Sequence, residues 1–427
     1  MEQETNAAAS AAAKAAKRAG LYLLAVLKWA VLSLVVGGVG GAVGAFFHKS
    51  IDLVTEFRMG HSYLVWFLPL AGLLTLLLYR LCKVSFGAGT NLIIESVSTN
   101  EHIPAFLAPL IYAGTVLSHL FGASVGREGA ALQLGGSIGH NLGELLRLKK
   151  DDVRVLSMCG MAACFSALFG TPVTAAIFVM EVISIGAMPY NAFLPCIAAS
   201  YGAFATAGFF GVQPLKFSLL SPIPELSTGS TFRVVLLAAL CAGVAILFCV
   251  AIHSVTHFAA RLLKNPYVRI LSGGLLMAVL TVVFGLYDYN GAGTNIIQNA
   301  MNGAVRPEAF LLKILLTALC VGVGFRGGEI VPTMFVGATF GCMMGPLLGL
   351  DADFAAAVGL VALFCSVVNC PIASIFLAIE LFGTLNLPLF VIAIAVSYVL
   401  SGYFGLYSSQ KIVFSKIKAE IIDKNTR

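Results

Sequence analysis

Residues 87–93 read GAGTNLI, and residues 291–297 read GAGTNII, so one motif recurs 204 positions later. Two further matches follow in the same order: GGSIG at 135–139 with GATFG at 337–341, and a proline nine residues before a glutamate at 172–181 and 371–380. Three ordered matches at a nearly constant offset indicate an internal duplication. We therefore predict a chain built from two homologous halves.

The composition places these halves in a membrane. Of 427 residues, 59% are hydrophobic and only 11% are charged, whereas soluble proteins carry about 25% charged residues. This excludes soluble enzymes, secreted disulfide scaffolds and nucleic-acid binders. The ten cysteines lie almost entirely in apolar segments without metal-ligand spacing, so we expect packing residues and neither a metal nor a cofactor.

Apolar segments follow one another along the chain with little separation. Several are shorter than the ~20 residues that a perpendicular span needs, and broken helices are tolerated in a membrane only where protein or a cavity surrounds them. We predict an all-α polytopic membrane protein of many short, tilted and broken helices, typical of a transporter or channel. The predicted segments are 21–47, 63–79, 103–123, 153–169, 172–185, 190–211, 232–252, 270–286, 309–323, 353–368, 371–383 and 386–404.

Clusters of basic residues predict the orientation, because cytoplasmic loops are enriched in lysine and arginine. The first GAGTN motif directly follows Arg80 and Lys83, whereas the second follows a span that begins at Arg269 and ends at 287–289 without a basic residue. The two copies should therefore lie on opposite sides, as in an inverted-topology repeat. We predict an inner-membrane protein with both termini in the cytoplasm.

This reasoning gives four predicted regions. They are a cytoplasmic amphipathic helix over 1–20, a first membrane repeat over 21–225, a second over 226–405, and a pore-lining C-terminal helix with a short basic tail over 406–427. No appended soluble domain is expected. Inverted repeats place their substrate where half-helix N-termini converge, and such termini favour anions. The residues alone thus predict an anion transporter or channel.

The GREGA sequence at 126–130 is the sharpest local feature, because an ionisable residue at membrane depth is costly. Glu128 could occupy the anion's place when ionised and release it when protonated, since burial favours the neutral form. The alternative is a glutamate that only stabilises a helix dipole.

Several motifs together resemble those of the CLC family of chloride channels and anion/proton exchangers. GREG at 126–129 resembles that family's GREGP, GAGTN at 87–91 stands in place of GSGIP, GGEIVP at 327–332 in place of GGxFxP, and Tyr407 in place of the pore tyrosine. The resemblance implies the CLC-type inverted repeat and a homodimer with one pathway per subunit.

The resemblance also implies the site residues. Glu128 would be the gating, proton-carrying glutamate, and the backbone N–H groups of Glu329 and Ile330 would hold the central anion together with the Tyr407 hydroxyl. Without that context, Tyr407 is better explained as an interfacial anchor. The predicted anion-binding set is Gly87, Ala88, Gly89, Thr90, Asn91, Gly126, Arg127, Gly129, Gly328, Ile330, Val331 and Tyr407.

Four departures from the family pattern bear on the transported ion. Ala88 replaces a chloride-contacting serine, Ala130 replaces the proline of GREGP, Val182 stands where chloride/proton exchangers often carry a second glutamate, and Glu329 brings a carboxyl into an otherwise apolar motif. The first motif without serine and the acidic GGExxP, together with the expected lack of an appended cytoplasmic domain, resemble the fluoride/proton antiporter branch. That branch has methionine at the position of Ala88, so the match is incomplete.

Fluoride is small and strongly hydrated, so its dehydration requires strong hydrogen bonds. A protonated Glu329 could donate one or relay a proton, although it could also be a helix cap that never titrates. Glu181 and Glu380, at equivalent ends of repeated helices, are expected to serve packing or dipole compensation. His253 and His257 lie four residues apart without a third ligand, so no metal site is expected there.

We predict a proton-coupled fluoride exporter, with a chloride/proton exchanger and a passive chloride channel as alternatives. A membrane-embedded enzyme has little support, because the spans lack a catalytic constellation. The expected partners are fluoride or chloride, protons, a second copy of the chain and the lipid bilayer, without nucleic acid.

Overall fold

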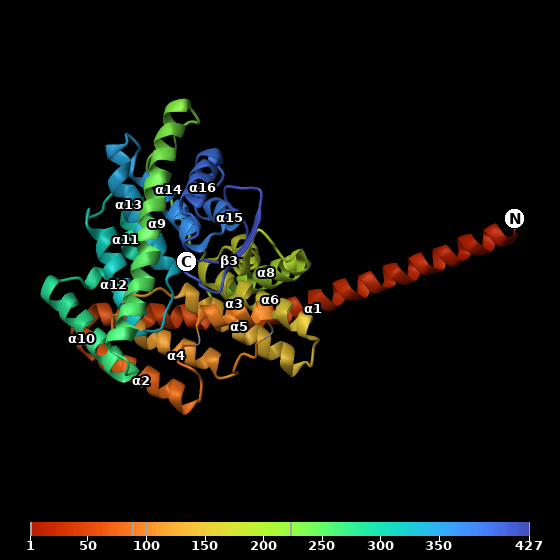
Figure 1. The fold of residues 1–427 in the computed structure, drawn as a ribbon, viewed down its shortest axis with the longest axis horizontal. Coiled ribbons are helices and arrows are strands. Elements are labelled where there is room, and N and C mark those ends of the chain that lie inside the picture. Colours follow the sequence, from red (N-terminus) through yellow and green to blue (C-terminus); the bar gives the residue numbers. More distant parts are fainter. Residues whose placement is uncertain (1, 88, 100, 223, 427) are drawn as a thin grey trace.

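The computed structural model describes residues 2–87, 89–99, 101–222 and 224–426, with side chains from residue 14 onward. Over these residues the chain is predominantly helical (Figure 1). The first half contains α1 Glu2–Gly60, α2 Leu68–Leu81, α3 Thr90–Thr99, α4 Leu107–Leu120, α5 Glu128–Leu145, α6 Lys150–Phe169, α7 Pro172–Ile183 and α8 Phe193–Phe209. The second half contains α9 Thr228–Leu262, α10 Pro266–Phe284, α11 Thr294–Met301, α12 Ala309–Val323, α13 Ile330–Leu347, α14 Ala352–Val368, α15 Pro371–Phe382 and α16 Leu387–Leu400.

These helices match the predicted apolar segments closely. In the described part of the chain, seven helical segments are long and apolar enough to cross a bilayer, while others, such as the 12-residue α7 and α15, are too short. Helices α3, α5, α11 and α13 have no counterpart among the predicted apolar segments. Each begins at a glycine-rich motif, and the helix expected to open at Glu128 is α5.

The repeated glycine motifs explain the tightest helix packing. A Cβ atom on Gly135 of α5 would lie 2.1 Å from the Gly160 carbonyl oxygen of α6. In the second half, a Cβ atom on Gly337 of α13 would lie 2.4 Å from the Gly359 carbonyl oxygen of α14. Both pairs therefore need glycine, because small residues let helix backbones approach each other in a membrane.

Two glutamates connect the halves reciprocally. The Glu181 carboxylate, on α7, accepts hydrogen bonds from the backbone N–H groups of 372–373 at 3.1 and 2.8 Å. The Glu380 carboxylate, on α15, accepts from the N–H groups of 173–174 at 3.0 and 2.9 Å. Each glutamate thus caps the N-terminus of the other half's helix, where free N–H groups and the dipole favour a negative charge. This confirms the expected packing and dipole role.

The N-terminal region differs from the prediction. The helix predicted over 1–20 is present as the first part of α1, but its predicted end at Gly20 is wrong, because α1 runs unbroken from Glu2 to Gly60. The first part of α1 extends away from the remaining helices (Figure 1). Gly20 does not end the helix, because the flanking alanines and leucines are strong helix formers and one glycine costs only ~1 kcal/mol.

The C-terminal helix predicted within 406–427 is also wrong. Strands β2 Lys411–Phe414 and β3 Ile421–Asn425 pair antiparallel, and β2 pairs in parallel with β1 Ser184–Ile185, directly after α7. The run KIVF at 411–414 favours a strand, because it contains β-branched and aromatic residues. The small sheet fixes the segment that follows Tyr407 against the end of α7. The predicted domain limits at 225/226 and 405/406 remain predictions.

Candidate functional site

The N-termini of α5 and α13 meet inside the protein. Gly126 and Gly328 form an isolated antiparallel bridge, in which the Gly126 N–H donates to the Gly328 carbonyl at 2.6 Å and the Gly328 N–H donates to the Gly126 carbonyl at 2.7 Å. One helix from each half therefore begins within two residues of this bridge. Two positive helix ends and their unpaired N–H groups converge, which creates an environment for an anion.

Glycine is required at this bridge. A Cβ atom on Gly328 would lie 2.4 Å from the Gly129 nitrogen, and a Cβ atom on Gly126 would lie 2.8 Å from Pro332 Cδ. Gly129 is equally constrained, since its Cβ would lie 2.9 Å from the Gly328 Cα. The glycines of the two motifs therefore allow the helix ends to touch.

The Glu128 carboxyl group folds back over the start of its own helix. The residue is only 3% exposed, and its Oε2 accepts a hydrogen bond from the Arg127 backbone N–H at 3.0 Å. The Arg127 Nε lies 3.5 Å from Glu128 Oε1. The carboxyl group thus lies at a helix N-terminus, an environment that favours a negative charge.

A chain of charged groups extends from Glu128 to α1. The Arg127 Nη1 donates to Asp52 Oδ1 at 2.6 Å, and Asp52 Oδ2 lies 3.0 Å from His48 Nε2. Asp52 and His48 were not predicted as site residues from the sequence. Their spacing of four residues on one helical face was the only available signal.

A cavity of about 180 Å³ adjoins Glu128. Its polar lining includes His48, Arg127 and Lys216, and Thr294 of the second half also contributes. Two cationic side chains and a histidine beside a single carboxyl group favour the approach of anions. The cavity therefore connects Glu128 with residues of both repeats.

Glu329 directly follows Gly328, the other side of the bridge, and is the N-cap of α13. One of its carboxyl oxygens would be 3.4 Å from a Cβ atom on Gly129, so the group lies against the start of α5. Its backbone carbonyl accepts the Thr333 N–H and hydroxyl, both at 2.9 Å. Among the described residues, no cationic side chain forms a salt bridge with the Glu329 carboxyl.

Tyr407 presents a hydroxyl group to the same region. The residue is 2% exposed, and within the described ranges its hydroxyl has no hydrogen-bond partner. It lies within electrostatic reach of the Glu329 and Glu128 carboxyl groups. A buried hydroxyl without a partner is unfavourable, so this one is available to a bound anion. The first-turn residues Ile330 and Val331 of α13 are also buried and carry N–H groups without a helical acceptor.

The first GAGTN motif lies at the start of α3, where it supports the Tyr407 segment. The Gln133 side chain of α5 donates to Thr90 Oγ1 at 2.8 Å, and the Ser409 N–H donates to Asn91 Oδ1 at 3.2 Å. Thr90 and Asn91 thus connect α3 with α5 and with the turn after Tyr407. Gly87 and Gly89 lie in the preceding turn, whereas Ala88 falls outside the described residues.

A buried side chain that was not predicted from the sequence holds the backbone at the second GAGTN motif. Lys313 of α12 is completely buried, and its Nζ donates to the carbonyl oxygens of Gly291 at 2.6 Å and Tyr289 at 3.0 Å. The ammonium group also lies 5.2 Å from the Phe335 ring centroid, within cation–π range. A lysine within an apolar segment was the signal that could have indicated this support.

Comparison with known proteins identifies the family. The profile described as voltage gated chloride channel matches residues 71–402, most of the chain. The chain belongs to the voltage-gated chloride channel (CLC) family. It is 37% identical over 398 residues to a chloride/fluoride channel protein of Pseudomonas syringae pv. tomato, covering 92% of this chain and 88% of the relative. It is 28% identical to the H(+)/Cl(-) exchange transporter ClcA of Vibrio cholerae, covering 84% and 82% of the two chains.

Solved CLC structures share the fold. A crystal structure of a CLC-type fluoride/proton antiporter superposes with a TM-score of 0.87 at 34% identity, covering 90% of this chain and 98% of the other. A slow cyanobacterial Cl-/H+ antiporter superposes with a TM-score of 0.75 at 19% identity, covering 87% and 94%. The predicted CLC-type inverted repeat is therefore confirmed.

In this CLC protein, the predicted site residues fall into two groups. The structure brings Gly126, Arg127, Glu128, Gly129, Gly328, Glu329, Ile330, Val331 and Tyr407 together around the meeting point of α5 and α13. The described residues of the first GAGTN motif instead lie at the start of α3 and reach the site through Gln133 and Ser409.

Proposed function

We propose that this protein exports fluoride across the plasma membrane in exchange for protons. The observation that carries the proposal is the meeting of two half-helix N-termini with a carboxyl group on each side of the bridge, Glu128 and Glu329. A 37% identical relative and a 34% identical solved structure support the choice of ion, because the description of each protein names fluoride.

The proposed cycle uses Glu128 as the shared gate. As a carboxylate it occupies the N-terminus of α5, accepting the Arg127 N–H, and thereby excludes an anion from that position. Once protonated it loses its attraction to the helix end and can be displaced by fluoride. The proton and the anion thus move in opposite directions through one position, and the protein acts as a transporter rather than as an enzyme.

The dehydration of fluoride is the main energetic requirement. The hydrogen bonds that fluoride loses with water must be replaced by short, strong hydrogen bonds with the protein. The unpartnered Tyr407 hydroxyl and the N–H groups of Ile330 and Val331 can supply donors, and a protonated Glu329 can supply one more. Glu329 is therefore assigned as the inner proton and anion relay.

The remaining architecture follows from the same proposal. Both termini lie in the cytoplasm, on the side of the basic clusters. The repeats comprise 21–225 and 226–405, and two copies of the chain form a homodimer in the bilayer with one pathway in each subunit.

A proteoliposome experiment tests the function. Purified protein is reconstituted into vesicles loaded with either fluoride or chloride, and anion efflux and internal pH are recorded with ion-selective electrodes and a pH-sensitive dye. We expect fluoride efflux to drive proton uptake against the proton gradient, with chloride efflux slower. Equal or faster chloride efflux would contradict the fluoride assignment, and anion efflux without proton movement would indicate a channel.

A further inference from the structure

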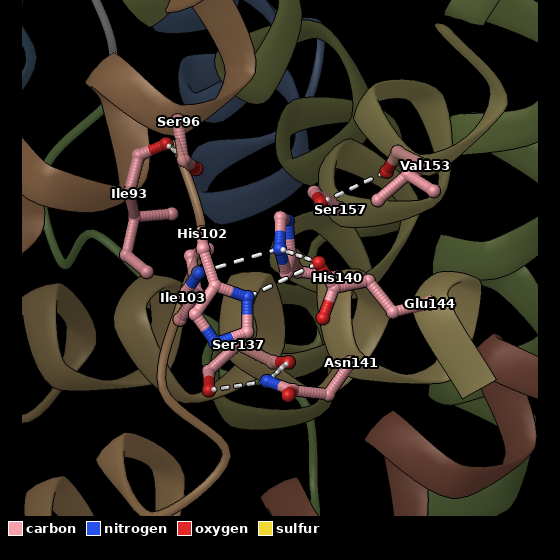
Figure 2. Close-up of polar contacts among 10 residues, drawn as sticks. All are labelled: Ile93, Ser96, His102, Ile103, Ser137, His140, Asn141, Glu144, Val153 and Ser157. Atoms are coloured by element: carbon pink, nitrogen blue, oxygen red, sulfur yellow. Dashed lines mark hydrogen bonds and ion pairs between the residues drawn. The ribbon is translucent and has the colours of Figure 1, made fainter. Parts of the chain in front are cut away.

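A cluster of metal-ligating side chains lies at the end of α5 opposite Glu128. His102, His140 and Glu144 each offer one ligand atom, and these atoms all lie within 4.8 Å of one another. Figure 2 shows the two imidazole rings and the carboxyl group pointing toward one another. None of these residues takes part in the anion site described above.

The chain brings these residues together from two elements. His140 and Glu144 are four residues apart, so they lie on one face of the last turns of α5. His102 comes from the segment between α3 and α4 and reaches the same point. Two ligands from one helical face and one from a packed neighbouring segment form a common arrangement for a metal site.

The distances fit a tetrahedral metal ion. The His102 Nδ1 lies 3.1 Å from Glu144 Oε1, and the His140 Nε2 lies 3.3 Å from the same oxygen. Zinc bound at about 2.0–2.2 Å by nitrogen and oxygen ligands holds them roughly 3.3–3.5 Å apart in a tetrahedron. Small side-chain movements would therefore place all three atoms around one ion.

The Nε2 atom of His140 has two polar neighbours in the cluster. The backbone N–H of Ile103 lies 3.3 Å from it, with the geometry to donate to an unprotonated Nε2. Glu144 Oε1 also lies 3.3 Å from this nitrogen. In the neutral tautomer that leaves Nε2 unprotonated, its lone pair would be available to a metal ion in place of the long Ile103 bond.

The cluster combines a fixed ligand with accessible ones. The His140 side chain is 7% exposed, whereas the side chains of His102 and Glu144 are 66% and 43% exposed. An ion can thus reach the cluster from water, and the fourth position would remain open to a water molecule. Two neutral imidazoles and one carboxylate are ligands that suit zinc and similar transition metals rather than calcium or magnesium.

We propose that His102, His140 and Glu144 form a binding site for a divalent transition metal ion of the zinc class. The bound ion would clamp the segment after α3 to the end of α5. Helix α3 is already connected to α5 at its other end by the Gln133–Thr90 hydrogen bond. The metal would therefore fix α3 at both ends against the helix that carries Glu128.

Zinc binding to the purified protein tests this site. The full-length chain, with its affinity tag removed and stripped of metal with a chelator, is titrated with zinc sulfate in detergent and followed by calorimetry. We expect one zinc ion per chain, and a loss of affinity of at least tenfold in both His102→Ala and Glu144→Gln. These side chains are largely exposed, so the variants should fold, whereas replacement of the buried His140 could disturb packing.

His257→Ala is the matched control, because His257 is an exposed histidine on α9 outside the cluster. It should bind zinc as the unchanged protein does. Cobalt(II) provides a second readout, since tetrahedral coordination gives intense visible absorption bands that should appear in the unchanged protein and be absent in His102→Ala. Equal zinc affinity in the unchanged protein and in His102→Ala, or no zinc binding at all, would overturn the proposal.

Discussion

The carboxyl groups of Glu128 and Glu329 lie on the two sides of the same glycine bridge, but their surroundings differ. Glu128 accepts a backbone N–H and lies at the end of a charged chain through Arg127 to Asp52, next to a cavity. Among the described residues, Glu329 has no salt-bridge partner and faces the start of α5. The first carboxyl group is thus coupled to charges that reach toward solvent, whereas the second is isolated inside the protein. This difference suggests a gate on one side of the bridge and a relay on the other.

Replacing the gate should have the largest effect. In Glu128→Gln we expect fluoride-driven proton uptake to fall to the level of protein-free vesicles, because an amide cannot carry a proton. Anion efflux should persist, since the substitution removes the negative charge that competes with the anion. The vesicle assay with a pH-sensitive dye measures both. Glu225 is an exposed glutamate before α9, so Glu225→Gln is the control and should transport fluoride and protons normally. Proton uptake that persists in Glu128→Gln would show that Glu128 is not the gate.

Replacing the relay should give a smaller, separable effect. In Glu329→Gln we expect coupled proton uptake to decrease at least about tenfold, the scale expected when a positioned proton donor is lost. The amide can still donate a hydrogen bond, so fluoride binding measured by calorimetry should change much less. Unchanged proton uptake would mean that Glu329 is only a helix cap, and the proposed division between gate and relay would fail.

The bridge between the two groups can be tested through stability. A Cβ atom on Gly328 would lie 2.4 Å from a backbone nitrogen, so Gly328→Ala should lower the free energy of unfolding by about 1–3 kcal/mol, as overpacking does. Thermal unfolding in a fixed detergent measures this as a lower midpoint. Gly243→Ala on α9, where no atom lies within 4 Å of the added carbon, is the matched control. Equal midpoints for the two variants would argue against a tight bridge.

The smallest effect is expected at the outer end of the charged chain. Asp52→Asn leaves Glu128 as the remaining ionic partner of Arg127, so more of the guanidinium's charge acts on the Glu128 carboxylate and holds it in place. The Asp52 side chain is 57% exposed and that of Arg127 13%, so water screens the pair from the Asp52 side and we expect it to be worth about 1 kcal/mol. Proton uptake should therefore slow by no more than about fivefold. Asp423→Asn, which removes an exposed pair with Lys411, should leave the rate unchanged.

The sequence predicted the parts of the site that depend on short motifs. The repeated GAGTN motif indicated the duplication, and the GREG and GGEIVP motifs located Glu128 and Glu329, because glycines and an ionisable residue at membrane depth are visible in one dimension. The partnership between Asp52 and Arg127 was not predictable, since 75 residues separate them. A helix was predicted within 406–427, whereas the local residues at 411–414 favour a strand. A boundary was predicted at Gly20, and the surrounding helix formers override it.

The reciprocal bonds of Glu181 and Glu380 also bear on how such a molecule could arise. A polypeptide corresponding to only one half would bury a carboxylate without donors and a helix start without an acceptor. Two copies of that polypeptide, inserted into the bilayer in opposite directions, would satisfy each other through the same pair of bonds. The two glutamates thus give a single chain the same reciprocal contact that a dimer of oppositely inserted halves would form.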